Sequence, residues 1–402
     1  MARLGVVERD ALPENERRFH DAVKAIRRRP ISGPFIVTMN SSPDLAARFA
    51  HLGHYFHARG QADESIVPIR VRSFVSLIGS RALDAPYEWA AWVNWALEAG
   101  IPQDTVDAIR EGKPPANLTS EERLVTDFCT QTISGNHRVN DTTFKAALDH
   151  FGTQGLVELV VTLGYFAMIA LPLNAFEIEM SAAQHAQRKP FEPLAVTGQV
   201  WVESGAAKRS PPLISTSAMA ARVPLLATHD DLERPHQHFL DRVIRSRGWI
   251  SPAFGLLLHS PDVAERIAAI GEFFLYETIL PPRAKALAWL ITARELDCNF
   301  AWASGVPAAH AAGVNAGLID ALEHGELLTA ATDQDHAVAA FCCELLRGNH
   351  HVSDGTYDEV VRRFGVKEAV QLATAVGYIA MMSLIVNPFE IPNAADATKP
   401  AL

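Results

Sequence analysis

The sequence is poor in cysteine, and its few cysteines are not arranged for disulfide or zinc chemistry. Four occur in 402 residues, at Cys129, Cys298, Cys342 and Cys343. None forms a Cys-x-x-Cys pair, and no histidine cluster stands beside them at zinc-ligand spacing. We therefore expect a reduced, cytoplasmic protein that holds no metal.

A basic surface is lacking as well. Lys and Arg number 36 against 46 Asp and Glu, so the net charge is −10. Nucleic-acid binding needs a concentrated basic stripe, and the one dense basic cluster is Arg27, Arg28 and Arg29. We expect this triplet to be a solvated helix terminus, and we expect no nucleic-acid partner.

No segment has the pattern of a signal peptide, and the longest apolar run favours a core helix over a membrane span. The first 18 residues carry charges where a signal peptide needs an apolar core. The longest apolar run, Leu156 to Leu173, contains Glu158 and Pro172. A buried core helix is predicted there, and no membrane association.

The chain contains an internal repeat. Residues 128–144 match 341–357, and residues 164–178 match 377–391, both at an offset of 213. Aligned without gaps, Glu88–Glu177 and Ala301–Glu390 share 31 identities in 90 positions, which indicates a duplication. Upstream the offset becomes 218, so the first copy carries five extra residues within 57–66.

Both copies have helical patterns. Apolar residues recur at helical spacing in 45–56. Asn140 and Ser353 stand where helix N-caps are expected, and Gly152 and Gly365 where helices stop. We predict an all-α protein with two helical units, residues 1–185 and 229–402, packed about a pseudo-twofold axis. A linker, 186–228, joins them and contains a candidate short strand at 199–204.

Several motifs carry a resemblance to a known family. They are a Pro-Phe pair near the start, Ser-Pro-Asp before a helix, Glu-Trp followed by Ala and Gly at helical spacing, Val-x-Asp, Gly-Tyr and Asn-x-Phe-Glu (in the first copy 34–35, 42–44, 88–100, 139–141, 164–165 and 174–177). The chain resembles the carboxymuconolactone decarboxylase family, within the alkylhydroperoxidase D-like superfamily. The resemblance implies two tandem domains of that helical fold, a small-molecule substrate, no cofactor, and a homo-oligomer, either a trimer or a dimer.

The active-site motif departs from the family pattern. The family's helix reads Glu-Trp-x-x-His, with a second Glu one helix earlier. Here the first Glu is Glu88, the His position holds Trp92, and the earlier Glu position holds Ser73; the second copy has Ala301, Gly305 and Ala286 at these positions.

The cysteines also depart from the peroxidase members of the superfamily. Cys298 matches the first cysteine of their Cys-x-x-Cys, but Ala301 takes the place of the second. A thiol peroxidase needs an attacking thiolate, a resolving thiol and a base, so that activity is not favoured.

Glu88 is the best candidate for acid–base chemistry. Among the aromatic rings of its helix a carboxyl group becomes a weaker acid and can exchange a proton near neutral pH. The alternative is a solvated or salt-bridged residue in a first helical turn. Trp92 could stack on a planar substrate or donate its indole N–H, or it could fill the space of a lost site.

Other candidates surround this pair. His51, His54 and His57 are spaced so that two could face one pocket, and His54 or His57 could assist Glu88; surface, core and metal-binding roles remain as alternatives. Arg72, or its neighbour Arg70, could clamp a substrate carboxylate or begin an exposed helix.

Two further candidates have counterparts in the second copy. Tyr165 is matched by Tyr378 and is expected to pack or to contact substrate. His137 and His350, in the shared Gly-Asn-His, are expected to be structural.

The sequence thus favours a cofactor-independent lyase or isomerase that acts on a small organic acid, lactone or oxygenated aromatic compound. Its site would lie in the first copy. Two alternatives remain: a non-catalytic small-molecule-binding or assembly protein, and a thiol peroxidase.

Overall fold

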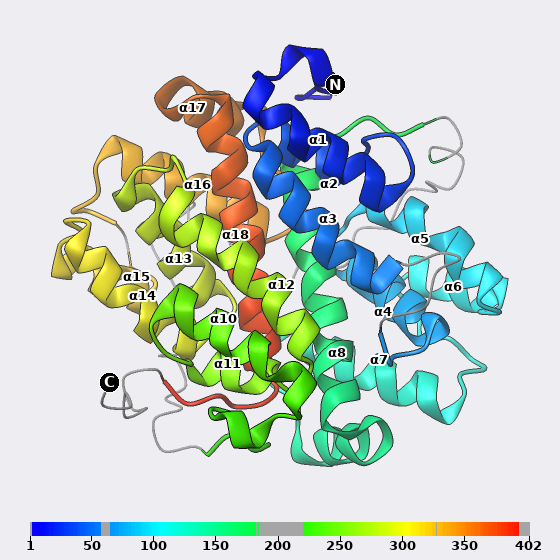
Figure 1. The fold of residues 1–402 in the computed structure, drawn as a ribbon. Coiled ribbons are helices and arrows are strands. Elements are labelled where there is room, and N and C mark those ends of the chain that lie inside the picture. The colour runs from blue at the N-terminus through cyan, green and yellow to red at the C-terminus, as the bar shows by residue number, and fades with distance from the viewer. Residues whose placement is uncertain (1, 58–64, 182–183, 185–219, 327, 394–402) are drawn as a thin grey trace.

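A computed structural model describes residues 2–57, 65–181, 184, 220–326 and 328–393 (Figure 1). We call 2–184 the first half and 220–393 the second half. Most of the predicted linker, and the whole of the candidate strand at 199–204, lie outside the described residues.

The described residues form seventeen α-helices and no strand, which confirms the all-α prediction. The helices are α1 (Glu14–Arg27), α2 (Pro34–Met39), α3 (Pro43–His57), α4 (Ile69–Ala82), α5 (Pro86–Glu98), α6 (Gln103–Arg110), α7 (Ser120–Ile133), α8 (Asp141–Phe176), α10 (Gln237–Arg247), α11 (Pro252–Leu257), α12 (Pro261–Glu272), α13 (Pro282–Glu295), α14 (Asn299–Ala311), α15 (Ala316–His324), α16 (Asp333–Leu346), α17 (Asp354–Phe364) and α18 (Val366–Val386).

Helix ends follow the signals in the sequence. Asn140 and Ser353 are N-caps whose side chains accept hydrogen bonds from backbone N–H groups three residues on. Gly365 ends α17, and its counterpart Gly152 has φ 67° and interrupts α8. The expected caps and stops are therefore confirmed.

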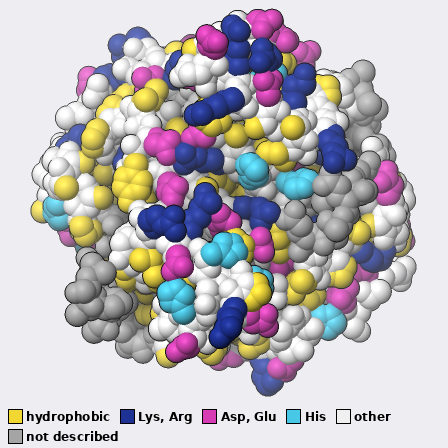
Figure 2. All heavy atoms as spheres, viewed as in Figure 1, with side chains coloured by type: hydrophobic (Ala, Val, Ile, Leu, Met, Phe, Trp, Pro, Cys, Tyr) yellow, Lys and Arg dark blue, Asp and Glu magenta, His cyan; other side chains and the backbone are white. Residues whose placement is uncertain are grey.

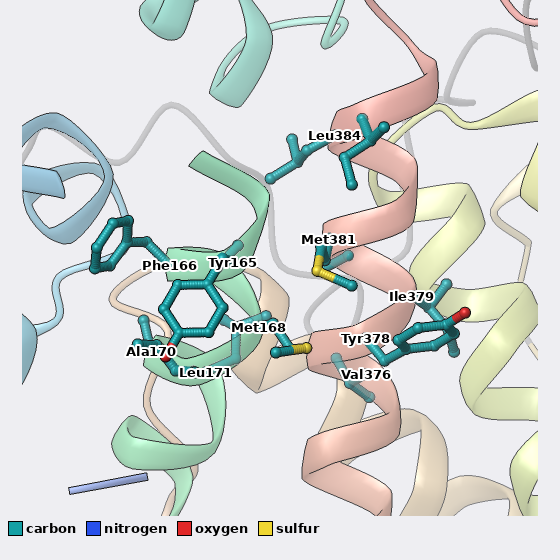
Figure 3. Close-up of a cluster of buried hydrophobic side chains, with 14 of the residues drawn as sticks. Tyr165, Phe166, Met168, Ala170, Leu171, Val376, Tyr378, Ile379, Met381 and Leu384 are labelled. Atoms are coloured by element: carbon teal, nitrogen blue, oxygen red, sulfur yellow. The ribbon is translucent and has the colours of Figure 1, made fainter. Parts of the chain in front are cut away.

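The centre of the protein is the crossing of α8 and α18 (Figures 1 and 3). Met168 and Met381 lie between the two helices in Figure 3. The backbones approach closely at two glycines. A Cβ on Gly377 would lie 2.5 Å from the carbonyl oxygen of Met168, and one on Gly164 would lie 3.0 Å from that of Met381.

Hydrogen bonds in the two halves recur at the offset of 213 residues. Asn174 Nδ2 donates to the Leu83 carbonyl over 2.9 Å, and Asn387 Nδ2 donates to the Leu296 carbonyl over 2.8 Å. Each amide side chain thereby satisfies a carbonyl at the C-terminal end of a neighbouring helix.

The two histidines of the shared Gly-Asn-His motif also have matching geometry. His137 and His350 have φ of 56° and 57°. Their Nδ1 atoms lie 3.1 Å from the carbonyl oxygens of Thr132 and Leu345. Burial lowers the pKa of His137 to about 4, so this ring stays neutral and holds a turn, as expected of a structural residue.

Two arginines join the halves in a reciprocal way. Arg3 donates from its backbone N–H to Phe176 and pairs with Asp354 of the second half. Arg222 donates to Phe389 and pairs with Asp141 of the first half. Residues 220–228, assigned to the linker from sequence, thus include a segment that packs as the N-terminal segment does.

A buried carboxylate lies where the halves meet. Glu158 is fully buried, and its oxygens accept hydrogen bonds from the Tyr55 hydroxyl, the Ser65 hydroxyl, the Ile66 N–H, the Gln154 amide and the Ser260 hydroxyl. Its counterpart Gln371 accepts two, from the Thr278 hydroxyl and the Ile279 N–H. These bonds satisfy a group that would otherwise strongly disfavour burial.

Two helices are long and apolar enough to cross a membrane by length and composition alone, α8 and α18. In the structure their most apolar windows are 100% and 94% buried inside the protein. On the face seen in Figure 2, basic and acidic side chains are intermingled.

We expect Gly377→Ala to destabilise the fold, because its Cβ would press on a backbone carbonyl that cannot rotate away. The free energy of unfolding should fall by about 2 kcal/mol or more, measured by urea denaturation. Gly355→Ala is the matched control. Nothing lies within 4 Å of its Cβ, so it should be neutral or slightly stabilising. Equal effects of the two substitutions would contradict the close approach of α8 and α18.

Candidate functional site

The first half contains a cavity of about 310 Å³. Its walls are the connection between α1 and α2, one face of α3, the first turns of α5 and the middle of α8. Four residues singled out from the sequence line it: Glu88, Trp92, His54 and Tyr165. The structure thus brings these four residues together around one cavity.

Glu88 lies in the first turn of α5, and its side chain is only 4% exposed. Burial raises the pKa of its carboxyl group to about 7. The charges of Arg27 and Arg29 and a hydrogen bond from Trp92 act in the opposite direction. The alternative of a solvated carboxylate is wrong, and the raised pKa agrees with the expectation from the aromatic surroundings.

Trp92 follows Glu88 by one helical turn and donates its indole N–H to the carboxyl group. Its ring centroid lies 4.9 Å from that of Trp95 and 5.1 Å from that of Phe166. Trp92 is therefore both a partner of Glu88 and part of an aromatic wall. Donating the indole N–H and packing among other aromatic rings are therefore compatible roles for Trp92.

Tyr165 reaches the cavity from α8 and is 2% exposed. Burial, and then the charge of Glu88, raise the pKa of its hydroxyl group. The phenol therefore remains protonated at neutral pH and can donate a hydrogen bond. Figure 3 shows Tyr165 and Tyr378 pointing away from the helix crossing on opposite sides.

Arg27 is a cavity residue that sequence reasoning missed. Its guanidinium lies 4.2 Å from the Phe35 ring centroid and donates to the Pro30 carbonyl and the Ser32 hydroxyl. Burial lowers its pKa to about 10. The prediction of a solvated triplet is wrong for Arg27; Arg28 is exposed, and Arg29 is exposed but still reaches the cavity mouth.

Gly33 and Tyr87 shape the wall beside Arg27. The Gly33 backbone has φ 60°, and a Cβ there would lie 2.8 Å from the Tyr87 ring. Glycine is thus needed both for the conformation and for the close approach. The Tyr87 hydroxyl hydrogen bonds with Ser32 and Gln184, which ties the α1–α2 connection to α5.

The three histidines of α3 differ in their placement. His54 is half-buried and lines the cavity, whereas His51 is exposed. His57 is the last residue of α3, and its side chain lies outside the described residues. Among the described residues, no group of three His, Cys, Asp or Glu side chains is arranged to hold a metal ion.

The assignment of Arg72 as a carboxylate clamp is wrong. Arg72 is 1% exposed, is not among the cavity residues, and donates to the Phe56 carbonyl over 2.7 Å. Its counterpart Lys285 donates to the Phe274 carbonyl over 3.0 Å. Both cations close the C-terminal end of a preceding helix, and α4 is buried on nearly every side, so no face of it is open to a ligand.

Arg70 does not supply the clamp either. It pairs with Glu122, and its counterpart Arg283 pairs with Asp335. Arg70, Arg72 and their counterparts Arg283 and Lys285 thus form structural ion pairs and caps.

In the second half an indole from the preceding helix takes the place of the Trp92 side chain. Trp289 stands at the position of Ser76, and its indole donates to the Ala301 carbonyl over 2.8 Å. A Cβ on Gly305, the counterpart of Trp92, would lie 2.5 Å from the Trp289 ring. Each half therefore has one indole at this pair of positions. In the first half it comes from α5, as Trp92, and in the second half it comes from α13, as Trp289.

The described cysteines are poor nucleophiles. Cys129, Cys298 and Cys342 are buried, and burial raises the pKa of each thiol. The pKa of Cys343 is raised to about 12 by the same cause. Since the thiolate is the reactive form, these positions do not favour thiol chemistry.

We expect Glu88→Gln to raise the melting temperature, and to raise it more at pH 8 than at pH 5. The carboxyl group has a pKa of about 7 in the folded protein, above the ordinary value of 4.5. The folded state therefore binds more protons between these values, and its stability falls as pH rises through them. Glutamine removes that loss.

Thermal unfolding followed by circular dichroism at several pH values would measure the difference. Glu14→Gln, at an exposed position in the first turn of α1, is the control and should leave the pH dependence unchanged. Parallel pH profiles for the wild type and Glu88→Gln would mean that the carboxyl group is not buried.

The chain was compared with protein families, curated proteins and solved structures. No protein-family model, curated protein or solved structure matches the chain.

Proposed function

We propose that the protein is a cofactor-independent lyase or isomerase of the carboxymuconolactone decarboxylase-like type. Its substrate would be a small organic acid, lactone or oxygenated aromatic compound. The observation that carries this proposal is the buried carboxyl group of Glu88, which has a pKa of about 7. Glu88 lines a cavity that is also lined by guanidinium and phenol groups. A carboxyl group with that pKa can both donate and accept a proton at neutral pH.

The proposed chemistry is proton transfer at carbon. When a carbon–carbon bond to a carboxylate breaks, CO₂ leaves and the bonding electron pair stays on the substrate as a carbanion or enolate. Protonated Glu88 gives its proton to that carbon, and the resulting carboxylate recovers a proton from water. In an isomerisation, ionised Glu88 first removes a proton from one carbon and then returns it to another.

The surroundings of Glu88 suit such a reaction. Trp92 and Trp95 supply a flat apolar wall against which a planar substrate can stack. Burial keeps bulk water from the carboxyl group, and the Trp92 indole fixes its orientation. His54, half-buried on the same cavity, is the proposed route for proton exchange with solvent.

The alternative is a non-catalytic binding or assembly protein. That alternative predicts an apolar pocket lined or filled by Trp92 and no acid shielded from solvent. Glu88 is 4% exposed and lines the cavity beside Trp92, which favours the enzyme. Keeping a carboxyl group there lowers stability at neutral pH, and such positions are frequent at catalytic sites.

We propose in addition that the chain arose by tandem duplication and that its halves are two domains of the alkylhydroperoxidase D-like fold, related by a pseudo-twofold axis. Hydrogen bonds that recur at an offset of 213 residues support this, as do the reciprocal contacts of Arg3 and Arg222. A cytoplasmic location is proposed from the cysteine pattern, and a homo-oligomer from the family resemblance alone.

Glu88→Gln should lower kcat/KM by about 10²- to 10⁴-fold, since it removes the proton donor and acceptor. The measurement is proton NMR in D₂O with unsaturated lactone carboxylic acids and β-keto acids, scored for loss of CO₂ and for deuterium at carbon. Glu14→Gln should retain full activity. Undiminished turnover in Glu88→Gln, on a substrate that the wild type converts, would rule out the mechanism.

Thiol peroxidase activity should be absent. We expect hydrogen peroxide to be consumed with dithiothreitol no faster than by the buffer, because Cys298 is buried and its thiol pKa is raised. A rate that exceeds the buffer rate and disappears in Cys298→Ser would contradict this expectation.

A further inference from the structure

A guanidinium, a phenyl ring and a phenol recur near the same place in both halves. In the second half Arg247 lies 4.4 Å from the Phe254 ring centroid and hydrogen bonds with the Tyr378 hydroxyl. The Arg247 guanidinium and the Tyr378 hydroxyl both pack against Gly271, where a Cβ would lie 2.4 Å from the Arg247 Nη2 and 2.4 Å from the Tyr378 oxygen. The second half therefore shows that the guanidinium and the phenol oxygen can meet there.

In the first half the same groups are arranged around a cavity. Arg27 keeps its stacking on Phe35, but its guanidinium donates to Pro30 and Ser32 of the α1–α2 connection. That connection has six residues, 28–33, against four, 248–251, in the second half. The longer connection holds the guanidinium at the wall, and Arg27 and Tyr165 both line the cavity.

The charge of the cavity favours an anion. Arg27 and Arg29 line it together with one carboxyl group, Glu88, which is close to half protonated at neutral pH. Two of the five N–H donors of Arg27 serve Pro30 and Ser32. A buried guanidinium gains most from a partner that is ionised and has two acceptor oxygens, as a carboxylate has.

We propose that Arg27 and Tyr165 together bind the carboxylate of a small planar acid whose ring or double bond stacks on Trp92 and Trp95. This inference rests on the proposed function, which it extends by assigning the anion-binding residues and the substrate charge. Tyr165 donates its hydroxyl hydrogen to one carboxylate oxygen, and Arg27 donates N–H groups to the carboxylate.

Binding of an anion also affects the acid. A second negative charge beside Glu88 disfavours its ionised form and raises its pKa further. Glu88 is then protonated when the substrate is bound, which is the form that a decarboxylation requires of it.

The test is isothermal titration calorimetry of the full-length protein with benzoate and with benzamide, which share a ring and differ in charge. We expect the wild type to bind benzoate more tightly than benzamide. Arg27→Gln should weaken benzoate binding by about 10- to 100-fold and leave benzamide binding nearly unchanged. Tyr165→Phe should weaken benzoate binding by a smaller factor.

Arg247→Gln is the matched control, because Arg247 ends α10 and stacks on Phe254 as Arg27 ends α1 and stacks on Phe35, and its substitution should affect neither ligand. Should Arg27→Gln not fold, Arg27→Lys keeps the charge without the planar fork and should give an intermediate loss. Equal affinity of the wild type for both ligands, benzoate binding too weak to measure at millimolar concentration, or unchanged benzoate binding in the folded Arg27 variant would each overturn the proposal.

Glu88→Gln separates this inference from the proposed function. It should bind benzoate at least as tightly as the wild type, since it removes a like charge from the cavity. If Arg27 governs benzoate affinity while Glu88→Gln retains full turnover, the anion site stands and the proposed mechanism fails. If Glu88→Gln is inactive while Arg27→Gln binds benzoate normally, the mechanism stands and the anion site fails.

Discussion

The whole architecture depends on how closely α8 and α18 approach at their crossing. Backbone lies against backbone there because Gly164 and Gly377 present no side chains to each other's helix. Dispersion contacts between two such close-packed helices are individually small and collectively large. The crossing sets the position of Tyr165 on one side and Tyr378 on the other, and with them the two places where a site could be built.

The halves solve one packing problem in two ways, with opposite consequences for chemistry. An indole must fill the region beside the start of α5 or α14. In the second half Trp289 supplies it and donates to the Ala301 carbonyl, and Ala301 stands where the first half has Glu88. In the first half Trp92 supplies it and holds the carboxyl group of Glu88, which leaves a cavity and a destabilising acid. Only the arrangement in the first half places beside the indole a carboxyl group that can hold a proton at neutral pH.

Much of this could be predicted from the sequence, and the errors have physical causes. Glu88 and Trp92 were identifiable from the positions that the family resemblance assigns to them, Tyr165 from its counterpart in the second copy, and His54 from its helical spacing. Arg72 was misassigned because proximity along the chain does not give orientation: α4 is buried on nearly every side, so its arginine had to cap a neighbouring carbonyl. Arg27 was missed because basic residues that end a helix are usually solvated. Only the tertiary position of Phe35, and the Ser32 and Pro30 acceptors, turn this one inward.

The reciprocal arginines have a consequence for how the chain is assembled. Arg3 and Arg222 each clasp the end of a long helix in their own half and the start of a helix in the other. Together with the α8–α18 crossing, they hold the halves by contacts that involve no residue between 184 and 220. The covalent connection guarantees one first half and one second half in each molecule. Two separate polypeptides would each be free to pair with a second copy of themselves, and the fused chain excludes that pairing.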